Sequence, residues 1–104
     1  MAFSRNAPAG LISKAFQRIA LNSTATALNS TAQVGTTVLV SVEAQNVRVT
    51  LDGSTTPTAN TGILLIPGNS PYWFDGVDAS KMSFARATSG AIIQVQSYKR
   101  VGDK

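Results

Sequence analysis

The chain has 104 residues, 43% hydrophobic and only 13% charged, with no His, no Cys and a formal net charge of +4. This length favours one domain. The missing side chains exclude disulfides, imidazole or thiolate metal sites, and catalytic pairs of a nucleophile with a histidine. No apolar run is long enough to predict a membrane span, and residues 1–10 lack the apolar segment of a secretory signal. The composition favours a small β-rich structural or binding module over an enzyme.

The N-terminal region is predicted to be an extended arm. Residues 1–14 are rich in Ala, Ser, Pro and Gly, which favour irregular backbone. A short helix over residues 10–20 is the alternative, because apolar residues recur there at helical spacing on one face. The arm is followed by a predicted single β domain over residues 15–98 and a basic tail over residues 99–104.

The body of the chain is predicted to be all-β. Alternating apolar and polar residues over 37–43 and 47–51 are typical of half-buried strands, and residues 44–46 between them are predicted to be a short hairpin connection. The apolar run 63–66 predicts a buried strand, and the Pro-Gly-Asn-Ser-Pro segment after it interrupts the chain. Further strands are expected over 72–74, 81–86 and 91–98. Seven or eight short strands with regular turn signals predict a small antiparallel β-sandwich or closed barrel.

The basic residues gather at the two ends of the chain. Residues 1–18 contain Arg5, Lys14 and Arg18 and no acid, and residues 99–104 contain three basic residues and one acid. Basic ends suit an acidic partner, although they also serve as solvated tails that aid solubility. A nucleic-acid partner ranks last, because nucleic-acid-binding arms usually cluster more Lys and Arg.

The acidic residues give little indication of chemistry. A carboxylate pair for glycoside hydrolysis and a calcium site from Asp75 and Asp78 are the alternatives considered. Asp52 and Asp75 each precede Gly, however, where Asp is a common turn residue. We therefore expect no catalytic residue, no cofactor and no metal site.

One aromatic cluster stands out at Tyr72, Trp73 and Phe74. These rings either pack in the core or form a contact surface, since Trp and Tyr are enriched at interfaces. The Pro-rich segment before them favours an exposed loop that presents the cluster to a neighbour.

The segment Val47–Gly62 resembles one that is common in small virion proteins of tailed bacteriophages. The likeness extends over roughly residues 16–98, and its features are Arg48, Asp52-Gly53, Pro57-Thr58, Gly62, Pro67-Gly68 and a last strand ending at Tyr98. Asp52, Gly53, Pro57 and Gly62 also have a physical interpretation as a structural corner. Gly supplies positive φ in a tight turn, and Pro ends the strand.

The resemblance implies a capsid decoration (cement) protein, which stabilises the shell by bridging subunits of the major capsid protein. Such a protein is made in the host cytoplasm and lies on the capsid surface of the virion. It is a homo-oligomer, with a trimer favoured, and it has no small-molecule substrate and no membrane contact. The candidate interface with the capsid or with neighbouring subunits comprises Arg5, Leu11, Ile12, Lys14, Phe16, Arg18, Tyr72, Trp73 and Phe74.

Two other functions stay open at this point. A head–tail adaptor, tail or fibre component fits the same resemblance. A shorter likeness, Asp52-Gly53-Ser54 followed by Pro57-Thr58, is to the Ig-like module of bacterial chitobiases and hexosaminidases. That likeness implies a carbohydrate-binding module with Tyr72–Phe74 as its stacking platform.

Overall fold

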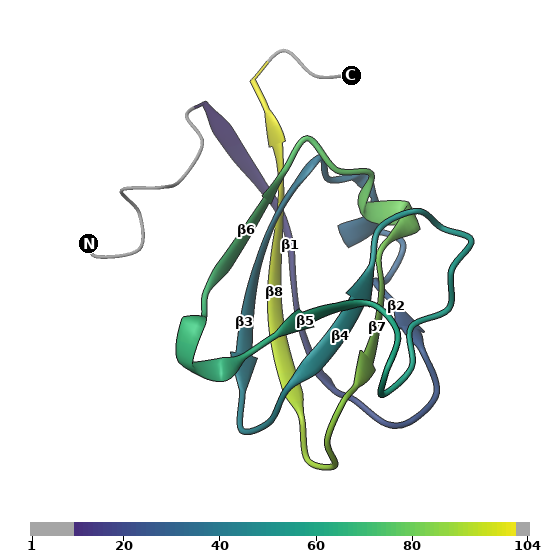
Figure 1. Ribbon diagram of the computed structural model, residues 1–104. Coiled ribbons are helices and arrows are strands. Elements are labelled where there is room, and N and C mark those ends of the chain that lie inside the picture. Colours follow the sequence, from purple (N-terminus) through teal and green to yellow (C-terminus); the bar gives the residue numbers. More distant parts are fainter. Residues whose placement is uncertain (1–9, 102–104) are drawn as a thin grey trace.

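Eight β-strands form two four-stranded antiparallel sheets in the computed structural model, which describes residues 10–101 (Figure 1). The first sheet has the order β1 (Leu11–Ala20), β8 (Ile92–Arg100), β3 (Thr37–Glu43) and β6 (Tyr72–Asp75). The second has the order β2 (Thr26–Ala27), β7 (Ser83–Arg86), β4 (Val47–Thr50) and β5 (Ile63–Leu65). Within residues 10–101, three short 3₁₀ helices connect strands: η2 (Ala32–Val34), η3 (Pro67–Asn69) and η4 (Ala79–Lys81). The predicted all-β fold is confirmed, in the form of a sandwich.

The core lies between the two sheets, where alternate side chains of each strand meet. Strand β3 turns Val38, Val40 and Val42 inward, and β4 turns Val47 and Val49 toward them. This is the two-residue period that the sequence predicts for both strands. Inward residues of the remaining long strands complete the core, among them Leu65, Phe84, Ile93 and Val95.

The N-terminal part of the described chain is a strand, so the alternative of a short helix over residues 10–20 is wrong. Strand β1 pairs with β8 from Leu11↔Arg100 to Ala20↔Ile92. Residues 11–14, which were expected to belong to the arm, are part of β1. Residues 99 and 100, which were expected to belong to the basic tail, are part of β8. The remainder of the arm, residues 1–9, lies outside the described residues. Pairing decides the outcome, because the apolar residues of this segment fit both a helical and a strand period.

The connection over residues 44–46 is not a hairpin. Strand β3 pairs with β8 and β6, whereas β4 pairs with β7 and β5. The segment therefore carries the chain from one sheet to the other, with Ala44 at a φ of +70°. The prediction fails because alternation shows which face of a strand is buried and does not show which strand it pairs with.

Different strands form the edges at the two sides of the sandwich, and the candidate sites lie on or near these edge strands. Strands β1 and β6 are the edges of the first sheet, and β5 is an edge of the second. The hydroxyl of Tyr72 accepts from the backbone N of Ile66 at 2.8 Å and donates to its O at 3.1 Å, which ties the end of β5 to β6. Strands β5 and β6 thus share one side, and β1 lies at the opposite edge of its sheet (Figure 1).

Candidate functional site

An apolar patch lies on the outer face of the first sheet. Leu39 of β3 pairs with Trp73 of β6 and with Gln96 of β8. Two residues further along β8, the ring of Tyr98 contacts the Trp73 ring at a centroid distance of 5.6 Å. We call Leu39, Trp73 and Tyr98 the outer patch. All three are half-buried and none belongs to the core, so the patch is a candidate contact surface for another protein.

The indole of Trp73 has an unusual environment in this patch. Its Nε1–H is buried, and no acceptor within residues 10–101 is in position to bind it. A buried indole N–H usually has a hydrogen-bond partner. Trp is among the residues that dominate binding energy at interfaces, so Trp73 is the central residue of this candidate surface.

Polar and charged groups border the outer patch. The Thr37 hydroxyl donates to Asp75 at 2.8 Å, and Arg100 forms an ion pair with the same carboxylate. The Thr37 hydrogen bond, followed by the charge of Arg100, lowers the pKa of Asp75. At the other end of the sheet, Gln94 donates to Glu43. An apolar centre with a polar rim is the usual arrangement of a protein interface.

The predicted aromatic cluster is divided by the pleat of β6. Tyr72 pairs with Val40 and Phe74 with Val38, and both pack against the core. Trp73 points the other way, into the outer patch. Sequence reasoning missed Leu39 and Tyr98. The available signal was Leu39, an apolar residue on the face of β3 that otherwise carries Thr, Ser and Glu.

The predicted interface residues of the N-terminal region lie along the edge strand β1. Phe16 is 59% exposed and Ile12 is 47% exposed, Lys14 and Arg18 are exposed, and Leu11 is half-buried. Phe16 and Arg18 share the outer face of the sheet, and Gln96 separates Phe16 from the outer patch. The register shifts between Ser13 and Ala15, so Lys14 is the extra residue of a β-bulge. Arg5 lies outside the described residues.

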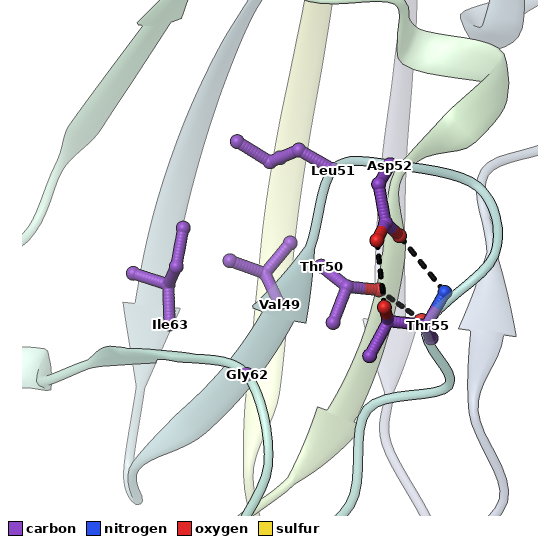
Figure 2. Close-up of a pocket in the computed structure, with 7 residues that line it drawn as sticks. All are labelled: Val49, Thr50, Leu51, Asp52, Thr55, Gly62 and Ile63. Atoms are coloured by element: carbon purple, nitrogen blue, oxygen red, sulfur yellow. Dashed lines mark hydrogen bonds between the residues drawn. The ribbon is translucent and has the colours of Figure 1, made fainter.

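The segment predicted to be a structural corner connects β4 to β5. Asp52 Oδ1 accepts from the backbone N of Ser54 at 3.1 Å. Figure 2 shows its two bonds with Thr55: Oδ1 accepts from the backbone N at 2.9 Å and Oδ2 from the hydroxyl at 2.6 Å. Further along, the Arg48 guanidinium donates to the carbonyl of Ala59 and to that of Gly62. Gly53 has a φ of +75° and Gly62 a φ of +123°, and Pro57 is buried.

A pocket of about 380 Å³ opens beside this segment. The apolar side chains of Val49, Leu51 and Ile63 line it, together with Asp52 and with Thr50, Thr55 and Gly62 (Figure 2). We call it the edge pocket. Sequence reasoning treated Asp52 and Gly62 only as turn residues and missed the cavity, because the cavity depends on how the long connection is placed beside β4 and β5.

The hydrogen bonds to Asp52 predict its titration. They lower its pKa from 3.8 to about 2, and the Thr55 hydroxyl makes the largest contribution. A lowered pKa in the folded state means that this carboxylate favours folding above pH 3.8, and that its contribution disappears as the pH falls from 3.8 to about 2. NMR titration of the side-chain carboxyl carbon should give a midpoint near 2 for Asp52.

The variant Thr55→Val should raise this midpoint toward 3.8, because it removes the hydroxyl donor. The matched variant Ser54→Ala should leave it nearly unchanged, since the Ser54 side chain contributes least. A wild-type midpoint near 3.8 would contradict the hydrogen bonding described here.

The two aspartates considered as calcium ligands have separate partners. Asp75 binds Thr37 and Arg100, whereas Asp78 accepts from the backbone N of Ser80 at 3.0 Å. Within residues 10–101, no three acidic residues gather in a group that could hold a metal ion. No helix in this part of the chain is long and apolar enough to cross a membrane.

Comparison with known proteins gives no match: no protein-family model, curated protein or solved structure is similar to this chain. Its function is therefore inferred from the surfaces described above.

Proposed function

We propose that the protein is a structural component of a tailed-bacteriophage virion, a capsid decoration protein that binds the major capsid protein through the outer patch. The observation that carries this proposal is the cluster of Leu39, Trp73 and Tyr98, half-buried on the outer face of the first sheet. An aromatic centre with a charged rim fits a protein partner. The resemblance of roughly residues 16–98 to small virion proteins of tailed bacteriophages indicates the class of partner.

The expected mechanism is stabilisation by binding. A ligand that binds the assembled shell and not its dissociated subunits stabilises the shell by mass action. When several copies are held together, each bound patch raises the effective concentration of the next, so modest single contacts give tight binding overall. Oligomeric copies whose outer patches lie on neighbouring capsid subunits therefore bridge those subunits.

Co-sedimentation with decoration-free capsids of the encoding phage tests the proposal. Wild-type protein should bind to saturation in proportion to the number of major capsid protein subunits. Leu39→Glu places a charge at the centre of the outer patch and should abolish binding. Trp73→Ala should weaken it about thirtyfold or more, the effect of losing an interface residue worth 2 kcal/mol.

Leu64→Glu is the matched control for Leu39→Glu. Leu64 pairs with Arg48 on the outer face of the second sheet and is exposed, so the same substitution there should leave capsid binding unchanged. Circular dichroism checks that the variants are folded. Wild-type binding by both Leu39→Glu and Trp73→Ala would exclude the outer patch. A few copies per virion would place the protein at the head–tail junction, tail or fibre instead.

A further inference from the structure

The edge pocket is an uncovered apolar site with a negative charge at its rim. Ile63 is 51% exposed, although its side chain lies on the same face of the second sheet as the buried Val49. Asp52 lines the same pocket, and its pKa of about 2 keeps it ionised at neutral pH. The pocket therefore suits an apolar group that is accompanied by a cation.

Strand β1 carries a group of this kind. Phe16 is 59% exposed, and Arg18, two residues further along the strand, projects from the same face. We call Phe16 and Arg18 the β1 knob. The edge pocket is large enough for the Phe16 ring. Its volume is about 380 Å³, and a cavity of about 150 Å³ already holds a benzene molecule.

The β1 knob and the edge pocket belong to different sheets. The knob projects from the outer face of the first sheet at its edge strand β1, whereas the pocket is formed by β4, β5 and the connection between them in the second sheet. The two sites of one chain therefore do not meet, but those of two chains can. We propose that the β1 knob of one copy enters the edge pocket of a second copy, with Arg18 facing Asp52.

Direct pairing of two β1 strands is the main alternative form of self-association, and the sequence of β1 opposes it. Lys14 and Arg18 lie on the edge strand, and the bulge between Ser13 and Ala15 interrupts its regular hydrogen-bonding pattern. Charged residues and bulges are common protections against edge-to-edge pairing. An antiparallel pair centred on Phe16 would also place Lys14 of one copy opposite Arg18 of the other. Side-chain insertion avoids this repulsion.

A contact of this kind is head-to-tail, since each copy contributes a different surface. Repeating it produces a ring if the rotation closes, or an open filament if it does not. All copies in a ring present their outer patches in equivalent positions, which is what multivalent binding to a shell requires. The self-contact does not depend on the capsid proposal, and it is tested with the purified protein alone.

Sedimentation velocity over a concentration series, followed by mixing of variants, tests the self-contact. Wild-type protein should associate with increasing concentration. Phe16→Ala removes the knob and Ile63→Lys blocks the pocket, and each should weaken association about ten- to hundredfold, the range expected for exposing one buried aromatic side chain. An equimolar mixture of the two variants should form a 1:1 dimer and nothing larger, because only one intact knob and one intact pocket are then present per pair.

Two matched controls accompany these variants. Val34→Ala changes an exposed apolar residue outside β1, and Leu64→Lys changes the neighbour of Ile63 on the opposite face of β5. Both should associate as wild type does. Higher salt should weaken wild-type association by screening Arg18 from Asp52. A wild-type protein that stays monomeric at every concentration would overturn the proposal, and so would a variant mixture that forms no dimer.

Discussion

Replacing Phe84 with Ala should lower the free energy of unfolding by about 3–5 kcal/mol. Phe84 is 0% exposed and is among the largest fully buried side chains of the described residues. It lies on β7 between Thr26 of β2 and Val49 of β4, and its side chain belongs to the core between the sheets, so its loss opens a cavity there. Domains of this size have a total stability of about 5–15 kcal/mol, so the variant should lose a large share of its stability.

Phe16→Ala is the matched control, since it makes the same substitution on the surface. Its cost should stay within about 0.5 kcal/mol, as for most exposed positions. Urea denaturation, with unfolding followed by circular dichroism, measures both variants. Equal destabilisation by the two substitutions would contradict the assignment of Phe84 to the core and of Phe16 to the surface. Retained stability of Phe16→Ala also makes its effect on self-association interpretable.

Sequence reasoning identifies the core strands well for a simple physical reason. Val38, Val40 and Val42 share one face of β3, whereas the other face carries Thr37, Ser41 and Glu43 with Leu39 as its one apolar residue. A strand with one face against a core and the other toward solvent shows this two-residue period. This two-residue period does not depend on which strands lie beside the segment, so the segment's own sequence is enough to predict its buried face. The predicted buried faces of β3 and β4 are confirmed.

Strand pairing was less accessible because it depends on distant segments. The alternative of a helix over residues 10–20 and the hairpin predicted at 44–46 are both wrong for this reason. Ala15 and Ile19 are compatible with a helix or a strand, and pairing with β8 near the other end of the chain decides between them. Similarly, no local feature of 44–46 shows that β3 and β4 belong to different sheets.

In the outer patch, the direction of the Trp73 side chain can be predicted from the sequence, but its contact with Tyr98 cannot. Alternation along β6 already indicates that Trp73 points away from Tyr72 and Phe74. Its contact with Tyr98, however, requires β3 to lie between β6 and β8 in a defined register. The edge pocket is equally hard to predict, because it forms where the long β4–β5 connection passes beside β4 and β5. Both candidate sites therefore depend on how distant segments are placed against one another, which a single sequence does not specify.

Gly35→Ala should destabilise the protein by about 1–3 kcal/mol, the usual cost of overpacking. Gly35 follows η2 with an ordinary φ of −70°, so the effect comes from close approach rather than from backbone conformation. A Cβ atom there would lie 2.9 Å from Ser97 Cβ and 3.1 Å from the Tyr98 carbonyl oxygen. Ser97 is fully buried, which leaves β8 little room to move.

The predicted strain at Gly35 also reaches the outer patch, because Tyr98 contacts Trp73. Trp73 is the single tryptophan of the chain, so its fluorescence reports on both the local change and global unfolding in urea. Gly68→Ala is the control: a Cβ there meets nothing within 4 Å, and its stability should be unchanged or slightly higher, because Ala restricts the unfolded chain. Equal stabilities for the two variants would show that the backbone at Gly35, just after η2, is not closely packed against β8. A destabilised Gly35→Ala with altered Trp73 emission in the folded state would show that η2 sets the position of Tyr98, and with it the shape of the outer patch.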